Sequence, residues 1–193
     1  NEGAGTMAGD GSGNGNRGTL TGGPTWVDGK RGKALNFDGV NDYVNVNDNS
    51  SLEGLAAITV SAWVKTNQIT VDGEIATKGA GSTAIWLLFQ DDVGAVSGRT
   101  DTFTFAVGNG TTLTRQEGTT GQAKVGVWTH VIGVWKKTPE EIRLYINGVE
   151  DTSSDTLNGI VMGTDTNSVN IGDDATLGTN VFNGLIDEVR VYN

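Results

Sequence analysis

The chain has 193 residues, 36% of them hydrophobic, which is enough to bury a sizeable core in one large domain. Its 23 acidic and 13 basic residues give a net charge of −10, which argues against nucleic acid as a partner and is compatible with neutral glycans or bound cations, acidic solubility being the simpler explanation. There is no cysteine and no apolar run near the roughly 20 residues of a membrane span, so we expect no disulfide, no thiolate site and no membrane insertion.

The N-terminal segment, residues 1–23, is rich in Gly, Asn and Ser and has the run DGSGNGN (10–16), which begins at Asp10, at its centre. Oxygen-bearing side chains at alternate positions, with glycines between them, let a loop fold several oxygens onto one hard cation such as calcium. A plain Asx-turn loop explains the same composition. The sequence leaves both interpretations open.

Short segments with strand character then recur at the spacing of a sandwich or barrel. They are expected over Thr25–Val27, Lys33–Asp38, Asp42–Val46, Ile58–Lys65, Glu74–Thr77, Ser82–Gln90, Thr102–Val107, Thr112–Gln116, Trp128–Lys136, Ile142–Ile146, Val169–Gly172 and the closing stretch Phe182–Tyr192. Asn147-Gly148 predicts a tight hairpin. No window of the chain carries a helical apolar stripe, so we expect very little helix. The prediction is an all-β fold, a two-sheet antiparallel β-sandwich of the jelly-roll kind, formed by a single domain over residues 1–193.

Alternation within these strands assigns side chains to faces. Ile58, Val60, Ala62 and Val64 share one face, and Trp63 lies on the other. Along Trp128–Lys136, His130 lies with Ile132 and Val134, which predicts a satisfied core histidine rather than a general base.

Asp187 stands among Ile186, Val189 and Val191 in the closing stretch. A carboxylate at such a position needs a partner that offsets the cost of desolvating its charge. A bound cation is one such partner. Backbone N–H groups, Arg190 or Arg31 are the alternatives.

Six segments together resemble the laminin G-like branch of the concanavalin A-like lectin and glucanase superfamily. They are DGSGNGN (10–16), GKALNFDGVNDYV (32–44), ITVSAWVK (58–65), WTHV (128–131), LYING (144–148) and FNGLIDEVRVY (182–192), in the order of that family and over nearly the whole chain. The resemblance implies a jelly roll of two curved sheets whose concave face holds glycans. It also implies an exported bacterial protein, in which such modules accompany polysaccharide-degrading enzymes or form part of surface adhesins.

The same resemblance implies a structural calcium ion on the convex side, which would fasten the chain ends. Asp187 would supply the side-chain ligand and Gly39 a carbonyl, with Glu2 or Asp10 from the N-terminal segment. A likeness to pentraxins implies that Asp173 and Asp174 lie near a second, ligand-side calcium, although a solvated loop is the alternative for that pair.

Catalysis is not expected. Glycosidases similar to this chain carry a Glu-x-Asp-x-x-Glu strand that presents two carboxylates at the separation needed for hydrolysis, and this spacing is absent. Phosphate-binding and zinc motifs are absent too. Flat rings beside hydrogen-bonding side chains suit a sugar. The candidate ligand-binding residues are Trp86, Trp135, Tyr145, Trp63, Arg99 and Arg143, with a place in the core as the alternative for the tryptophans and a solvated surface charge as the alternative for Arg99.

The sequence therefore predicts a non-catalytic carbohydrate-binding module, stabilised by calcium, that anchors a secreted enzyme or surface protein to a polysaccharide or oligosaccharide. We expect it to be extracellular, monomeric and covalently linked to other domains. The rival hypothesis is a laminin G-type adhesion domain that binds a protein partner or acts as a spacer.

Overall fold

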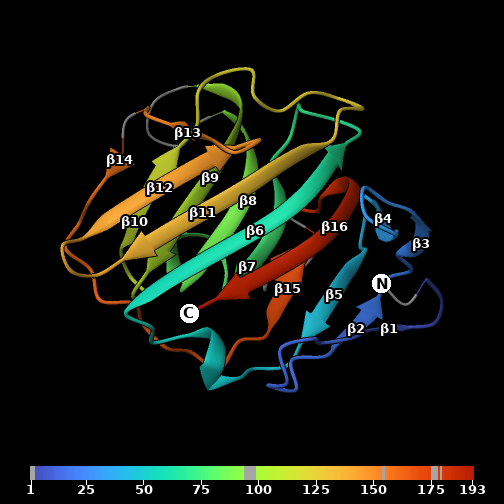
Figure 1. Cartoon of the computed structure of the whole chain (residues 1–193), viewed down its shortest axis with the longest axis horizontal. Helices are drawn as coiled ribbons and strands as arrows, with labels where there is room; N and C mark the ends of the chain where they lie inside the picture. The colour runs from blue at the N-terminus through green and yellow to red at the C-terminus, as the bar shows by residue number, and fades with distance from the viewer. Residues whose placement is uncertain (1–2, 94–98, 154, 175–177, 179) are drawn as a thin grey trace.

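A computed structural model describes residues 3–93, 99–153, 155–174, 178 and 180–193, and in these the chain forms two antiparallel sheets packed face to face (Figure 1). The nine-stranded sheet runs in the order β1 (Met7–Ala8), β2 (Gly18–Thr21), β5 (Tyr43–Val46), β15 (Val169–Ile171), β7 (Gly73–Lys78), β8 (Trp86–Val93), β9 (Thr100–Gly108), β10 (Leu113–Glu117) and β14 (Asp155–Thr156). The seven-stranded sheet runs in the order β13 (Val149–Asp151), β12 (Glu141–Ile146), β11 (Thr129–Lys136), β6 (Ala57–Thr66), β16 (Asn183–Tyr192), β4 (Lys33–Asp38) and β3 (Thr25–Asp28).

The predicted β-sandwich with very little helix is confirmed. The described helical segments are two single 3₁₀ turns, η1 (Ser50–Leu52) and η2 (Gly81–Thr83). η2 falls where the sequence predicted the start of a strand, and the short strands β1, β2 and β14 were not predicted. None of the described helices is long and apolar enough to cross a membrane. The Asn147-Gly148 turn joins β12 to β13 with φ of 53° and 82°, as a tight hairpin requires.

The core lies between the two sheets and includes Ile58, Val60, Ala62 and Val64 of β6, as alternation predicted. Its largest side chains include Trp86, Trp135, Phe37, Phe105 and Phe182, all at most 1% exposed. At Gly133 the sheets approach so closely that a Cβ would lie 2.1 Å from the Phe105 ring, so only glycine fits there.

The two faces of β11 are the reverse of the predicted ones. Val131, Gly133 and Trp135 face the core, whereas His130, Ile132 and Val134 are only half-buried on the outer face. Both rows are partly apolar, so alternation alone did not decide between them. The prediction of a core histidine is therefore wrong.

Candidate functional site

The outer face of the nine-stranded sheet carries polar side chains beside apolar ones across β7, β8 and β9. Glu74 pairs in register with Phe89, and Phe89 pairs with Thr104. Residues that are paired directly across antiparallel strands point to the same face. A bulge in β7 between Glu74 and Ala76 changes the alternation, and this bulge turns the Glu74 side chain to the outer face.

A cavity of about 190 Å³ hollows this face. Its lining residues are Asp72, Glu74, Gly81, Ser82, Leu87, Phe89, Asp91, Ala106, Leu113, Arg115 and Asn180. Leu87, Phe89 and Ala106 form a small apolar cluster separate from the main core, against which Leu113 packs. The cavity thus has an apolar part and an acidic end made of Asp72, Glu74 and Asp91.

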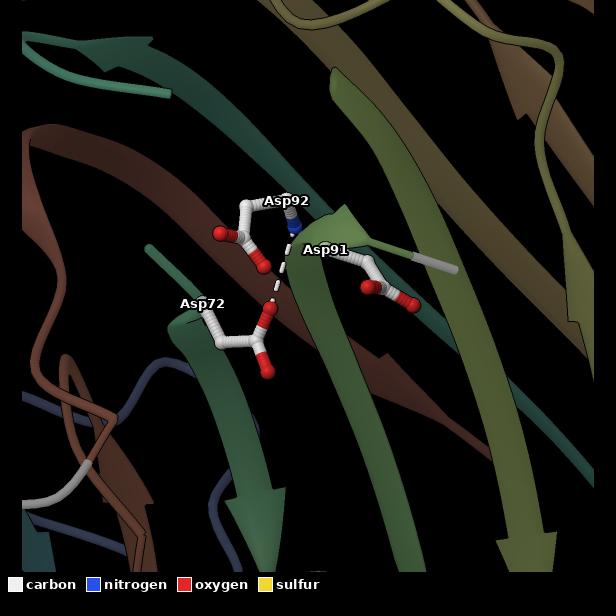
Figure 2. Close-up of side chains that lie close together, drawn as sticks. All are labelled: Asp72, Asp91 and Asp92. Atoms are coloured by element: carbon white, nitrogen blue, oxygen red, sulfur yellow. Dashed lines mark hydrogen bonds between the residues drawn. The ribbon is translucent and has the colours of Figure 1, made fainter. Parts of the chain in front are cut away.

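Two carboxylates of that acidic end, Asp72 and Asp91, lie close to a third, Asp92 (Figure 2). Asp72 immediately precedes β7, and Asp91 and Asp92 lie at the end of β8. One carboxylate oxygen of each lies within 4.8 Å of the others. The backbone N–H of Asp92 donates a hydrogen bond of 3.0 Å to Asp72 Oδ1, which fixes the start of β7 beside the end of β8.

Glu74 lies in the same acidic end and is only 3% exposed. Its Oε2 atom is buried and has no hydrogen-bond partner in the described structure. Burial raises the pKa of Glu74 well above its usual value, and the negative charges of Asp174, Asp72, Asp173 and Asp91 raise it further. Burial and the carboxylate of Asp92 likewise raise the pKa of Asp72, against the opposing effect of the Asp92 N–H. The site concentrates negative charge in a place that water hardly reaches.

Asp173 and Asp174 flank this region from the end of β15. They are 0% and 2% exposed, so the solvated loop considered as their alternative is wrong. Asp173 Oδ1 accepts a hydrogen bond from the N–H of Asp174 at 2.8 Å, and its Oδ2 accepts one from the N–H of Gly178 at 2.7 Å. Both oxygens of Asp173 are therefore already used by the backbone.

Two of the predicted ligand-binding residues belong to the core instead. Trp86 and Trp135 are both fully buried between the sheets, at 0% exposed. The Nε1–H of Trp86 donates to the carbonyl of Leu52 at 2.8 Å, and that of Trp135 lies 3.5 Å from Glu140 Oε1. The prediction that Trp86 and Trp135 contact a ligand is therefore wrong. An indole ring can fill an apolar core or stack on a sugar, and the sequence does not distinguish the two.

Trp63, Tyr145 and Arg143 lie on the outer face of the other, seven-stranded sheet. The ring of Trp63 stacks on His130 with 4.8 Å between the ring centres, and Lys30 Nζ lies 4.6 Å from its centre. Arg143 is engaged by Glu141 and Glu150. These three residues are far in the fold from Arg99, whose guanidinium donates to the carbonyl of Glu117 on β10 at 3.3 Å. The predicted binding set is therefore not brought together.

The predicted calcium set also fails to assemble. Asn183 pairs with Asp38, next to Gly39, and Asp187 lies four residues further along β16, about 13 Å away in an extended strand. Asp187 Oδ2 accepts the N–H of Arg31 at 2.8 Å, which was one of the alternatives, and its Oδ1 is buried without a hydrogen-bond partner. Gly39 is therefore no co-ligand of Asp187.

Of the two remaining members of that set, the structure describes Asp10. Asp10 accepts hydrogen bonds from the N–H and hydroxyl of Ser12, both 2.8 Å, and from the N–H of Asn16 at 2.9 Å, as the Asx-turn interpretation expects. Glu2 lies outside the described residues. Calcium at Asp187 therefore stays a prediction, without Gly39 among its ligands.

A larger groove of about 720 Å³ opens between the sheets beside β16. Most of the side chains along it are apolar, among them Trp26, Phe37, Val44, Ile171 and Val191. Polar and charged side chains line it as well, among them Asp10, Lys33, Asp187 and Arg190. The smaller cavity on the outer face is the better candidate, because three carboxylates beside it lie within 4.8 Å of one another.

Sequence reasoning missed Asp72, Glu74, Asp91 and Asp92. A signal was present: Asp91-Asp92 directly follows an apolar strand, and Asp72-Gly73-Glu74 opens the preceding one. Two neighbouring antiparallel strands joined by one turn bring the start of the first beside the end of the second. The two acidic pairs were therefore bound to meet once β7 and β8 formed a hairpin.

Comparisons with known proteins agree with the architecture. A family model described as the concanavalin A-like lectin/glucanases superfamily matches residues 37–193. A search among curated proteins finds no match.

Three solved structures are similar in fold. Domain 4 of AbnA, a GH43 extracellular arabinanase from Geobacillus stearothermophilus solved with arabinotriose, is 24% identical with a TM-score of 0.63, over 91% of this chain and 82% of that one. The CBM40 of Ruminococcus gnavus IT-sialidase, bound to α2,3-sialyllactose, is 14% identical with a TM-score of 0.62, over 82% and 89%. A SAP-like pentraxin from Limulus polyphemus is 16% identical with a TM-score of 0.56, over 81% and 73%.

Proposed function

This chain belongs to the concanavalin A-like lectin/glucanase superfamily, and from that premise we propose that it is a non-catalytic carbohydrate-binding module. Its role would be to anchor a secreted polysaccharide-active enzyme or a surface protein to a glycan. The observation that carries the proposal is the cavity on the outer face of the nine-stranded sheet, in which an apolar part meets polar groups. The oligosaccharides named for the AbnA domain and the CBM40 support the class of ligand.

The cavity suits a sugar in its chemistry. Leu87 and Phe89 present an apolar surface to the C–H groups of a sugar ring, while the carboxylates and Arg115 offer partners for its hydroxyls. At about 190 Å³ it is smaller than the 300–1,000 Å³ usual for ligand pockets. It would therefore receive the end of a glycan rather than enclose a long chain.

The opposite outer face is less suited to sugars. Trp63 and Tyr145 are aromatic side chains there, but His130 stacks on the ring of Trp63 and Lys30 lies over it. Arg143 is held between two glutamates. A glycan would have to displace these contacts before it could stack.

A matched pair of arginine variants tests the proposal. In affinity gels that contain arabinan or a sialylated glycan, and in calorimetric titrations with arabinotriose and sialyllactose, Arg115→Met should weaken binding on the order of tenfold, because a hydrogen bond from a charged group is lost. Arg143→Met, on the other sheet, should bind as the wild type does. An equal loss of glycan affinity in both variants would contradict a site in the cavity. If the protein binds no polysaccharide at all, the adhesion-domain hypothesis is favoured.

The acidic residues of the cavity make a hydrolysis assay a necessary control. Glycoside hydrolysis uses one protonated and one ionised carboxyl group, and Glu74 with its raised pKa lies near Asp91. We expect no release of reducing ends from any polysaccharide that the protein retains. Measured turnover that Glu74→Gln abolishes would contradict the non-catalytic assignment.

An extracellular location and a bound calcium ion are further parts of the proposal. Secretion follows from the class of ligand, since polysaccharides of this kind lie outside the cell. Calcium is tested by the effect of EDTA on the melting temperature.

A further inference from the structure

We propose that the acidic end of the outer-face cavity is a calcium site, formed by Asp72, Asp91 and Asp92 with Glu74 beside them. It is separate from the Asp187 set that the sequence suggested, and it does not depend on whether the cavity binds a sugar.

The geometry of the three carboxylates suits a single ion. Their nearest oxygens all lie within 4.8 Å of one another. Calcium binds oxygen at about 2.3–2.6 Å, so two ligands on opposite sides of one ion are at most roughly 4.6–5.2 Å apart. All the donors are oxygens, which hard cations prefer over the nitrogen and sulfur ligands of zinc or copper.

Glu74 is an independent sign that a partner belongs here. It is 3% exposed, lines the same cavity as Asp72 and Asp91, and has a buried carboxylate oxygen with no hydrogen-bond partner in the described structure. A carboxylate in such a place is costly unless it is paired. A cation among the three aspartates would supply the missing charge.

No basic side chain performs this task in the described part of the chain. Arg115 lines the cavity from β10, two strands away from β7, and no described ion pair joins it to Glu74 or Asp72. The strongest electrostatic neighbours of Glu74 are Asp174, Asp72, Asp173 and Asp91, all of them acidic. The neighbours that act most strongly on Glu74 thus supply no positive charge.

An ion at this position would have a clear structural effect. It would clamp the start of β7 to the end of β8, beside the hydrogen bond that the Asp92 N–H donates to Asp72 Oδ1. Because the unfolded chain does not hold these carboxylates together, binding free energy would appear as stability of the fold.

The experiment measures calcium binding and stability together. The protein is treated with EDTA, transferred to chelator-free buffer and titrated with CaCl₂ by calorimetry, while parallel melts record the midpoint with and without the ion. We expect one ion per chain and a rise of the melting temperature. Glu74→Gln and Asp91→Asn should each weaken the affinity at least about tenfold, which is the loss of roughly one charged ligand.

The change in melting temperature caused by Glu74→Gln, measured without and with calcium, distinguishes a calcium-binding role of Glu74 from a purely structural one. Without calcium, Glu74→Gln should melt at or above the wild-type temperature, because it replaces a buried carboxyl group that lacks a partner with a neutral amide. With calcium the wild type should melt at a higher temperature than Glu74→Gln, since the ion stabilises the wild type more. Asp91→Asn gives a second, conservative variant should one of the two fold poorly.

Asp187→Asn is the matched control, because Asp187 is equally buried and also has an oxygen without a partner. It should keep the full calcium response. The proposal is overturned if the response survives in both Glu74→Gln and Asp91→Asn, if it is lost in Asp187→Asn, or if the wild type takes up no calcium. Glycan binding is read separately through Arg115→Met, so failure of one proposal does not mimic failure of the other.

Discussion

Strand β7 carries a buried charge near each end, and the structure treats the two in opposite ways. At its last residue, Lys78 is 0% exposed, and its Nζ lies 2.8 Å from Asp48 Oδ1, 3.0 Å from Asp165 Oδ1 and 3.2 Å from Glu53 Oε2. The carbonyl of Asn167 accepts a further hydrogen bond at 2.7 Å. At the other end, Glu74 is nearly as buried, yet its Oε2 has no partner and its neighbours are acidic.

The pKa shifts express the same contrast. Burial alone would lower the pKa of Lys78, but hydrogen bonds with Asp48 and Asp165 outweigh it, and the pKa is raised. At Glu74, burial and the neighbouring charges act in the same direction, against ionisation. Lys78 shows that this protein can pair a buried charge completely where the charge has a structural role. The shortfall at Glu74 therefore marks the end of β7 where a partner from outside the chain belongs.

The largest effect on unfolding free energy should come from Lys78→Met, which removes the paired charge at the last residue of β7. It leaves three carboxylates around an apolar side chain, and loss of one partner of a buried ion pair typically costs about 3–5 kcal/mol. Denaturant unfolding measures the free energy. Lys136→Met removes an ion pair with Glu141 whose side chains are 43% and 36% exposed, and it should cost far less unfolding free energy, because solvent screens an exposed pair. Similar costs for the two lysines would contradict the interpretation.

A smaller effect on unfolding free energy is expected for Trp86→Phe. This variant tests the core-facing side of β8, where Trp86 lies next to Lys78. Trp86 pairs with Lys78 in register, and its Nε1–H satisfies the carbonyl of Leu52. Phenylalanine leaves that carbonyl without its donor and the site partly empty, at a cost of about 1–3 kcal/mol in unfolding free energy. Glycan binding should not change, since the cavity lies on the other face. A fall in glycan affinity at unchanged stability would contradict this assignment.

The smallest effect concerns acid stability at the Lys78 end. Burial alone would raise the pKa of Asp165, but hydrogen bonds with Asn167 and Lys78 outweigh it, and the pKa is lowered. A carboxyl group whose pKa is lower in the folded state contributes stability above its unfolded pKa and loses it as pH falls through the folded value. The difference in unfolding free energy between wild type and Asp165→Asn should therefore shrink as pH falls below about 4. A difference that stays constant down to pH 2 would show that Asp165 is not ionically paired.

Much of the fold was predictable because strands leave a local signal. The alternation of Ile58, Val60, Ala62 and Val64 placed β6 within one residue at each end, and Asn147-Gly148 located the β12–β13 hairpin. Strands no longer than one period of the alternation, such as β1 at two residues, carry no such signal. The binding residues were less predictable, because a tryptophan has the same chemistry whether it meets a sugar or fills a core.

By itself the sequence determined the all-β sandwich, the position of most strands and which side chains share a face within a regular strand. Only the tertiary structure decided which of those faces is inner. In β11 the decision is made at Gly133, which gives the ring of Phe105 the space it needs and so turns Trp135 inward. In β7 the decision is made by one bulge: without it Glu74 would share the inner face with Ala76 and Lys78, and with it the carboxylate faces the cavity. A bulge depends on pairing with the neighbouring strand, which the local pattern of a single strand does not contain.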